Sequence, residues 1–476
     1  MYTKATQRYL ALDLGAESGR GILAHFDGDR LTMEEVGRFA TGQGEGDLGP
    51  DGVRHWDIDR IGTEVESLLA KAETMAGTLH GVGVDTWGVD FGLLDARGNL
   101  LEAPVHYRDE RHPIAMADVH GLLDTAEIWA LTGIQFMPFN TLYQLYARQK
   151  RAPGLLDKAA NLLMMPDLLH HRLTAGRSLK GEITNASTTQ IVNPRTRDWE
   201  PSLLTKLGLP SHFLGEIVPA GSKLGVTESG VPVYAPGTHD TASAVAATPA
   251  APGTRWAFLS SGTWSLLGVE LPEPNLSQQA FQDGFSNELG VGNTVRFLKN
   301  IMGLWLVQEC RRSLARTEGK EFSYPELAAL AEAAPEGGPI IDATAHRFLA
   351  PPDMAAEIRA ACRESGLPAP EGVGPLIRCC LDSLADAYRQ AIGELERMLS
   401  TKFDVLHIVG GGSQNRLLNQ LTANACGIPV IAGPSEATAI GNVLGQFVAS
   451  GAVTDWQQAR TVARLSFPTE TFEQRT

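Results

Sequence analysis

YLALDLGAESGRGILA, from Tyr9 to Ala24, and WAFLSSGTWSLLGVEL, from Trp256 to Leu271, are two copies of one pattern. Each predicts a buried apolar strand, a tight turn of small and hydroxyl residues, and a second apolar strand. Small residues in such a turn let backbone N–H groups and hydroxyls approach phosphate oxygens closely. One copy by itself also fits an ordinary β-hairpin. The repetition predicts two similar domains whose hairpins face each other across a polyphosphate.

The composition is that of an ordinary globular protein with an acidic balance. The chain has 476 residues, of which 43% are hydrophobic and 20% charged, and its net charge is −15. This length predicts two or three domains, and the negative charge argues against nucleic acid or an anionic membrane as a partner. The sequence has no apolar run long enough to span a bilayer and no signal-peptide core near its start. We therefore expect a cytoplasmic protein.

The cysteines predict free, mostly buried thiols. There are five, an odd number, and they form neither a C-x-x-C pair nor a Cys/His cluster with zinc spacing. Cys362 and Cys379 flank a stretch rich in glycine and proline. For this pair, a disulfide is the alternative to two free thiols.

Strands and helices alternate along the chain, which predicts an α/β fold with mixed sheets. The turn-rich stretch Ala251–Thr254 marks the boundary between an N-terminal domain, residues 1–248, and a C-terminal domain, residues 249–476. Helical patterns dominate residues 125–215, which we interpret as an insertion on the first domain.

A second glycine-rich turn stands late in the chain. Gly410, Gly411 and Gly412 follow the apolar strand VLHIV and precede a helix. In open α/β sheets such a turn at the carboxyl end of a strand is a ligand site, here for adenosine or phosphate, and tight packing is the alternative. The chain has no P-loop and no kinase glycine loop. ATP would therefore require the two hairpin turns for its phosphates and the glycine turn for its adenosine.

Three aspartates are candidates for chemistry. Asp13 and Asp85 each stand at the end of a buried strand, where a carboxylate beside phosphates suits Mg²⁺, and where capping a turn is the alternative. Asp240 stands beside His239 before a helix of small residues. It is typical of an N-cap, and it also suits a general base for a substrate hydroxyl.

Other polar and aromatic residues are weaker candidates. Asn300 and Gln308 lie in FLKNIMGLWLVQEC, which we interpret as one apolar helix that places both on about the same side. Trp56 and Trp87 offer flat faces to a sugar ring, or belong to the core.

Eight segments resemble the FGGY carbohydrate kinases. They are LALDLGAESGR, GVGVDTWGVDFGLLD, FMPFNTLYQLYA, LLMMPDLLHHRLT, HDTASAVAATP, LSSGTWSLLGVE, LKNIMGLWL and HIVGGGSQNRLLNQL, and they span residues 10 to about 421. The resemblance implies two actin-like, ribonuclease-H-like domains with a catalytic cleft between them. Within the family, the D-T-W-G-V-D-F and F-N-T-L-Y-Q-L blocks are similar to the branch that phosphorylates L-rhamnulose at C1 with Mg²⁺ and ATP.

The resemblance also implies roles for individual residues. It makes Asp240 the catalytic base, whereas the metal role of Asp13 rests only on its place at the end of a buried strand. The residues implied to bind ATP are Ala16, Glu17, Ser18, Gly19, Arg20, Thr263, Gln308 and Gly411. The residues implied to bind the sugar are Gly88, His239, Asp240, Thr241 and Asn300.

Glu17 departs from the family pattern, because a small or hydroxyl residue is expected there. A carboxylate beside ATP is unfavourable unless it faces solvent or Mg²⁺. Two alternatives stay open: a sibling kinase for L-fuculose, L-xylulose or another ketose, and an actin-like ATPase that uses no sugar. We expect ATP and a small ketose as partners, and a monomer or a small homo-oligomer.

Overall fold

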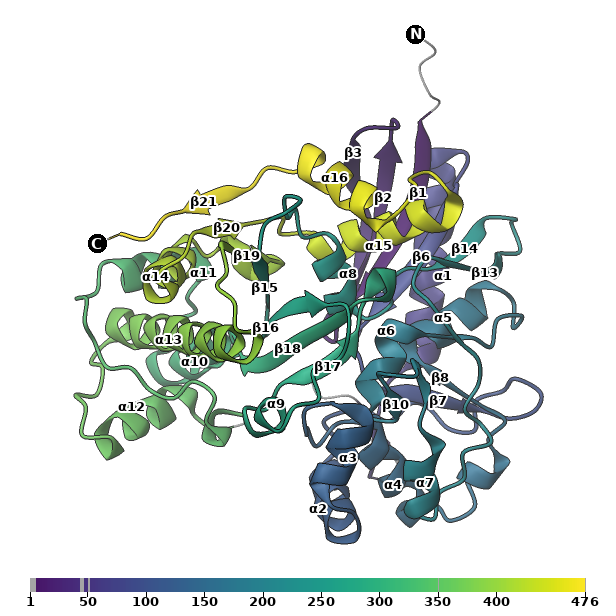
Figure 1. Ribbon diagram of the computed structural model, residues 1–476, viewed down its shortest axis with the longest axis horizontal. Coiled ribbons are helices and arrows are strands. Elements are labelled where there is room, and N and C mark those ends of the chain that lie inside the picture. The colour runs from purple at the N-terminus through teal and green to yellow at the C-terminus, as the bar shows by residue number, and fades with distance from the viewer. Residues whose placement is uncertain (1–5, 43–46, 50–51, 350, 476) are drawn as a thin grey trace. The chain divides into compact units, whose positions relative to one another are not determined.

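The computed structural model describes residues 6–42, 47–49, 52–349 and 351–475 (Figure 1). The chain forms two compact units. Unit 1 comprises Met1–Pro249, Glu270–Phe297 and Ala437–Ser466, and unit 2 comprises Ala250–Val269, Leu298–Glu436 and Phe467–Thr476. Each unit thus draws on separate parts of the chain, and the division into domains 1–248 and 249–476 stays a prediction.

Unit 1 is built on a six-stranded mixed sheet in the order β13-β14-β6-β1-β2-β3. The first hairpin forms as predicted, since β1 pairs antiparallel with β2. On its other side β1 is parallel to β6, which is itself parallel to β14. The strands are β1 Gln7–Leu14, β2 Ser18–Phe26, β3 Leu31–Ala40, β6 Gly81–Thr86, β13 Ser222–Val226 and β14 Pro232–Ala235.

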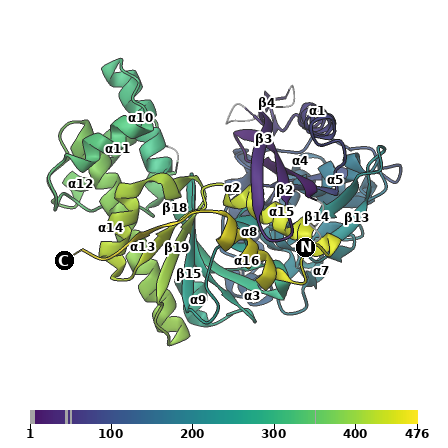
Figure 2. The same cartoon turned by 90° about the horizontal axis from the view of Figure 1, so that it is seen from above.

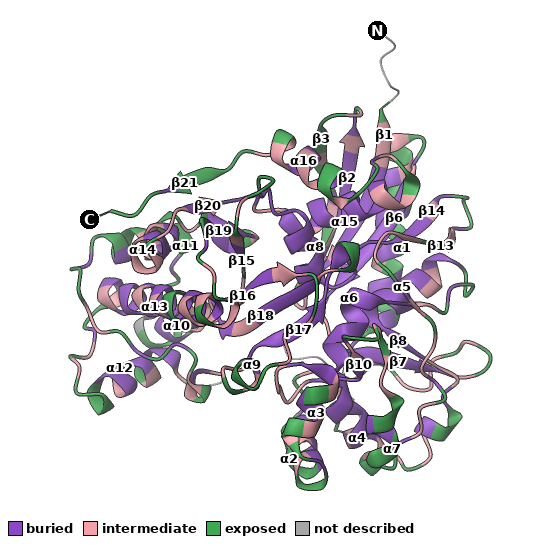
Figure 3. Ribbon diagram, in the orientation of Figure 1, coloured by how far each residue is buried: buried purple, intermediate pink, exposed green. Residues whose placement is uncertain are grey.

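Helices cover both faces of this sheet, which explains the continuous apolar run of β1. Leu10 and Leu12 belong to the core that includes Ile61 of α1 (Ile58–Ala76). The ring of Tyr9 lies 5.0 Å from that of Phe447 on α15 (Ala437–Ser450). Successive side chains of a strand point to opposite faces, so α1 and α15 lie on opposite sides of β1. Figure 3 shows the buried interior of these strands.

A second core in unit 1 lies under the helical section predicted for residues 125–215. Short strands β7 (Phe91–Leu94) and β8 (Asn161–Met164) pair antiparallel. Their apolar residues pack with those of α2 (Arg111–Leu122), α4 (Thr141–Arg151) and α7 (Pro201–Lys206). The section is therefore largely helical, with its own apolar cluster.

The second large sheet has seven strands in the order β17-β18-β16-β15-β19-β20-β21. The second hairpin also forms as predicted, because β15 pairs antiparallel with β16, and β15 is parallel to β19. In unit 2, α10 (Trp305–Glu318), α11 (Tyr324–Glu332) and α12 (Met354–Glu364) form one helical group (Figure 2). The strands are β15 Trp256–Ser261, β16 Trp264–Leu271, β17 Ser286–Leu289, β18 Val295–Met302, β19 Val405–Val409, β20 Val430–Ala432 and β21 Glu470–Phe472.

One predicted element is wrong. The segment FLKNIMGLWLVQEC is not a single helix: it is strand β18, a turn at Gly303, and the start of α10 (Trp305–Glu318). A short apolar run cannot be assigned to a buried strand or a buried helix by periodicity alone. Gly303 forms the turn between the strand and the helix. A Cβ at this position would lie 2.7 Å from the carbonyl carbon of Trp264, so the close approach of the two backbones favours glycine.

The thiols are free, as predicted. All five cysteines lie among the described residues and none of them forms a disulfide, so Cys362 and Cys379 are not bonded. Among the helices that the structure describes, none has both the length and the apolar character of a membrane span.

Candidate functional site

The turn of the first hairpin is closed by its own backbone. The Gly15 N–H donates to the Ser18 carbonyl at 2.9 Å, and the Thr41 hydroxyl donates to the Gly15 carbonyl at 2.6 Å. Glu17 stands exposed at the tip. Gly19 is buried, and a Cβ there would lie 2.6 Å from the Phe39 ring. A side chain at position 19 would therefore require the Phe39 ring to shift, and the turn presents Glu17 to solvent.

Asp13 and Arg20 face each other across this hairpin. They are register partners of β1 and β2, and the Arg20 Nε and Nη2 donate to Asp13 Oδ2 at 3.0 and 2.8 Å. Asp13 is also the register partner of Asp85 on the parallel strand β6. The hairpin thus sets one guanidinium and two carboxylates side by side.

Asp85 is the more deeply buried of the two carboxylates, and its environment opposes ionisation. Burial, then the charge of Asp13, raises the pKa of Asp85 well above its usual value. Asn442 of α15 donates to Asp85 Oδ2 at 2.6 Å. No hydrogen bond from the described residues reaches its Oδ1.

These two carboxylates suit Mg²⁺. This ion is usually held by one or two carboxylates together with substrate phosphates and water, rather than by a full set of protein ligands. The part of the chain that the structure describes contains no cluster of three or more His, Cys, Asp or Glu residues arranged to hold a metal. Asp13 and Asp85, with the unpartnered Oδ1, match the smaller set that a phosphate-borne cation needs.

The candidate sugar residues of unit 1 gather at two strand ends. Gly88 follows β6, and His239, Asp240 and Thr241 follow the parallel neighbour β14. The Thr86 N–H donates to the Thr238 carbonyl at 2.9 Å, which joins the two segments. Carboxyl ends of adjacent parallel strands are where α/β sheets bind ligands. Gly88 and the segment His239–Thr241 therefore follow neighbouring strand ends, and their binding of sugar stays a prediction.

The two oxygens of Asp240 differ. Asp240 opens α8 (Asp240–Ala246), with His239 as its N-cap. Its Oδ1 accepts hydrogen bonds from the backbone N–H and the hydroxyl of Thr241, and lies 3.4 Å from Nε2 of His239. No described residue donates to Oδ2, and the side chain is 33% exposed. One oxygen is thus anchored, and the other is free to take a proton.

In unit 2 the second hairpin turn rests on the start of α10. The N–H groups of Leu304 and Trp305 donate to the carbonyls of Gly262 and Thr263 at 3.0 and 3.1 Å. The Thr263 hydroxyl also lies 3.3 Å from the side-chain amide of Gln308. Thr263 and Gln308 are therefore in contact, although the strand-turn-helix that joins them was not predicted.

The glycine turn packs against the same hairpin, because β15 and β19 are parallel neighbours. A Cβ on Gly412 would lie 2.0 Å from the Ser261 Oγ. Gly411 is exposed, with no atom within 4 Å of an added Cβ. Gly412 is thus required for packing, and Gly411 has open space around it that a ligand could enter.

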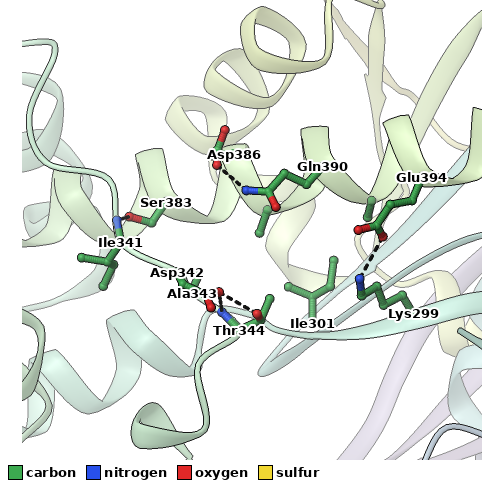
Figure 4. A pocket seen from close by; sticks show the side chains of 12 residues that line it. Lys299, Ile301, Ile341, Asp342, Ala343, Thr344, Ser383, Asp386, Gln390 and Glu394 are labelled. Atoms are coloured by element: carbon green, nitrogen blue, oxygen red, sulfur yellow. Dashed lines mark hydrogen bonds and ion pairs between the residues drawn. The ribbon is translucent and has the colours of Figure 1, made fainter. Parts of the chain in front are cut away.

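Asn300 lies on β18, partly buried, rather than on a helix. Its neighbour Lys299 lines a pocket of about 50 Å³, where it is ion-paired with Glu394 at 2.8 Å (Figure 4). Twelve residues line this pocket, among them Asp342 and Asp386, and none of them is a predicted site residue. A volume of this size holds a few waters at most.

Trp56 and Trp87 are core residues. Their rings lie 4.2 Å apart, and both indole N–H groups donate to Oδ2 of Asp90, at 2.6 and 3.0 Å. Burial raises the pKa of Asp90 to about 6, in spite of these hydrogen bonds. Because both rings are buried, their positions do not support the alternative that they stack on a sugar.

Sequence reasoning missed the charged residues behind His239. Glu288 on β17 and Arg296 on β18 are buried and ion-paired at 3.1 Å, and both lie next to the His239 ring. Glu182 is buried as well, and it accepts hydrogen bonds from Thr238. Charged residues inside apolar stretches such as VRFL were the available signal.

Comparisons with known proteins decide the family. Sequence models of the FGGY family of carbohydrate kinases match twice: the N-terminal domain over residues 8–243 and the C-terminal domain over residues 257–450. This chain belongs to the FGGY family of carbohydrate kinases. As a member, it is an enzyme that transfers phosphate to a sugar.

FGGY relatives match over almost the whole chain. The rhamnulokinase of Enterococcus faecalis is 42% identical, covering 98% of this chain and 94% of the relative. That of Yersinia pestis biovar Antiqua is 44% identical, covering 96% and 93%. The crystal structure of gluconate kinase from Lactobacillus acidophilus superposes with a TM-score of 0.78 at 14% identity, covering 99% and 94%. That likeness confirms the predicted α/β fold of two actin-like domains.

Proposed function

We propose that this carbohydrate kinase transfers the γ-phosphoryl group of ATP to the C1 hydroxyl of L-rhamnulose, giving L-rhamnulose 1-phosphate and ADP in L-rhamnose catabolism. The observation that carries the proposal is the identity of 42–44%, over both halves of the chain, to relatives named rhamnulokinase. A substrate pocket depends on only a few contacts, and identity across the whole chain favours their retention.

Asp240 is the base in this proposal. As the C1 oxygen forms its bond to phosphorus, the bond from the γ-phosphorus to the ADP oxygen breaks, and the hydroxyl proton passes to Oδ2 of Asp240. The free Oδ2 supports this role, and the anchored Oδ1 keeps the carboxylate oriented. General-base assistance typically contributes about 10²–10⁴-fold. Positioning and charge neutralisation supply most of the rest in phosphoryl transfer.

The phosphates and adenosine of ATP are assigned to three turns. Exposed or half-buried small residues in these turns support the assignment, since backbone N–H groups there can approach phosphate. The proposed ATP-binding residues are Ala16, Glu17, Ser18, Gly19, Arg20, Thr263, Gln308 and Gly411. The proposed sugar-binding residues are Gly88, His239, Asp240, Thr241 and Asn300.

Mg²⁺ is the proposed cofactor, with Asp13 and Asp85 as the residues that would hold it. When bound with ATP, the ion neutralises charge on the transferring phosphate. Arg20 holds Asp13 in place beside Asp85, because its Nε and Nη2 both donate to Oδ2 of Asp13.

The first experiment measures ADP release from Mg-ATP with L-rhamnulose, L-fuculose and L-xylulose, beside a control without sugar. A strong preference for L-rhamnulose in kcat/KM supports the proposal. Preference for another ketose keeps the kinase and changes the substrate. Hydrolysis that proceeds equally without sugar would overturn the sugar kinase and favour an ATPase.

We also propose a cytoplasmic location. Free thiols are typical of reducing compartments, and all five cysteines of this chain are free.

A further inference from the structure

A buried ion pair lies behind His239, and no proposed step of the reaction uses it. Arg296 is fully buried, and its Nη1 lies 3.1 Å from Oε2 of Glu288. Its Nη2 contacts Nδ1 of His239 at 3.2 Å. Glu288 Oε2 lies 3.3 Å from the same Nδ1. Both charged groups therefore meet one nitrogen of the ring, and the opposite nitrogen, Nε2, faces Asp240.

Arg296 decides which ring nitrogen carries the proton. A guanidinium donates hydrogen bonds and accepts none, so the contact with Nδ1 requires a lone pair on Nδ1. In a neutral imidazole the proton then resides on Nε2, from which it points at Oδ1 of Asp240. The contact between Arg296 Nη2 and Nδ1 has hydrogen-bond geometry at 3.2 Å, and Glu288 Oε2, at 3.3 Å, competes for the same nitrogen as an acceptor.

Glu288 keeps the guanidinium in place. Burial acts to raise the pKa of Glu288, but the charge of Arg296 and the contact with His239 outweigh it, and the pKa is lowered. The carboxylate thus stays ionised opposite the guanidinium. Arg296 Nη2 also donates to the carbonyl of Leu289 at 3.2 Å, which fixes its direction. A buried pair that loses one partner leaves an uncompensated charge, so the two depend on each other.

Other charged groups near His239 act through its backbone or through Arg296. Glu182 accepts hydrogen bonds from the Thr238 N–H and from the hydroxyl of Thr184, and that hydroxyl in turn accepts from the His239 N–H. Burial lowers the pKa of Arg296. The charge of Glu288 opposes this effect most, and the charges of Glu182, Asp240 and Glu270 oppose it less. The backbone of His239 is held from one side and its ring from the other.

We infer that Glu288 and Arg296 are positioning residues that hold His239 as the Nε2–H tautomer and, through it, orient the carboxylate of Asp240. The inference rests on the proposed role of Asp240 as base. With Oδ1 facing the ring N–H and the two donors of Thr241, the carboxylate cannot rotate without losing them, and Oδ2 stays turned to the substrate hydroxyl.

The tautomer can be read directly. The full-length protein, labelled with ¹⁵N-histidine, is compared with its His239→Gln variant at neutral pH to assign the ring nitrogens of His239 by NMR. We expect a neutral ring with the proton on Nε2. A proton on Nδ1, or on both nitrogens, would overturn the inference. This readout does not depend on turnover, so it stands even if Asp240→Asn retains activity and the base proposal fails.

Kinetics supply the second test. Glu288→Gln keeps the size of the side chain and removes its charge; we expect kcat to fall about tenfold, with KM for the sugar changed about twofold or less. Arg296→Gln should lower kcat as much, and Arg296→Lys should restore part of it, because lysine still donates to Nδ1.

The matched control is Glu102→Gln, which breaks another buried pair of unit 1, Glu102 with Arg148 at 3.2 Å. It should lower the unfolding midpoint while kcat stays near the wild-type value. An equal loss of kcat in Glu102→Gln and Glu288→Gln would reduce the Glu288–Arg296 pair to a purely structural role and reject the inference.

Discussion

Asp13 and Asp85 are direct register partners on adjacent parallel strands, and the guanidinium of Arg20 donates two hydrogen bonds to Asp13. Asp13 is thus paired with a cation, while Asp85 lies buried beside it with an oxygen to which no described residue donates a hydrogen bond. Such a pair costs folding free energy when the protein holds no cation, because burial and a neighbouring charge both oppose ionisation.

Asp85→Asn should therefore stabilise the unliganded protein. The pKa of Asp85 is higher in the folded protein than in the unfolded chain, so its favourable contribution is present at low pH and is lost as the pH rises. We expect the unfolding midpoint of the variant to exceed that of wild type by about 2–4 °C at neutral pH, and the difference to shrink toward pH 4. Thermal unfolding at several pH values measures it. A variant less stable than wild type at neutral pH would contradict the prediction.

The contribution of Asp90 to stability should fall as the pH rises, as that of Asp85 does. Its pKa is raised to about 6 in the folded protein. The stabilisation by its protonated form is therefore fully present below the pKa of the unfolded chain, and it is lost as the pH rises through about 6. Relative to Asp90→Asn, wild type should lose unfolding free energy between about pH 4 and about pH 7.

Asp95, at a nearby turn, is the matched control for Asp90. Hydrogen bonds from the Asn99 and Arg97 backbone N–H groups lower its pKa, so its contribution is lost as the pH falls. Asp95→Asn should therefore show the opposite sign in the same melting series. Equal slopes for the two variants would argue against the buried environment of Asp90 as the cause.

Gly411 and Gly412 are neighbours with different expected functions. Gly412→Ala places a Cβ against the Ser261 hydroxyl and should destabilise the protein by about 1–3 kcal/mol. Gly411→Ala meets no atom, so its midpoint should match wild type, while its KM for ATP rises several-fold if a nucleotide lies there. Melting curves and ATP titrations separate the two effects.

A second-site variant checks the cause of the Gly412 effect. Ser261→Gly removes the side chain that the new Cβ would meet and leaves the carbonyl oxygen of residue 261 at 2.9 Å, so it should recover part of the stability of Gly412→Ala. Failure of the double variant to recover would place the strain elsewhere in the turn.

Asp240→Asn should fold normally and lose about 10²–10⁴-fold in kcat, because the amide cannot take the proton of the sugar hydroxyl. The exposed Asp118→Asn is the control, and its kcat should equal that of wild type. ADP release measures both. Near-normal turnover by Asp240→Asn would remove Asp240 from the role of base.

The elements that sequence reasoning predicted are those whose signal is local. Both hairpins and the strand before Gly410 follow from apolar periodicity and turn residues within each stretch. Family motifs placed Asp240, His239 and Gly88 on one site, and unit 1 brings these three together. The segment around Asn300 was misassigned, because a buried strand and a buried helix have the same apolar composition there.

The sequence by itself determined the family, the duplicated hairpin and the residue types at each turn, because these depend on neighbours along the chain. Only the tertiary structure decided that Ser261 meets Gly412, and that His239 lies between Asp240 and the Glu288–Arg296 pair. Contacts of that kind join segments far apart in sequence. Strand pairing and burial create them, and a buried charge acquires its partner only when the sheet is assembled.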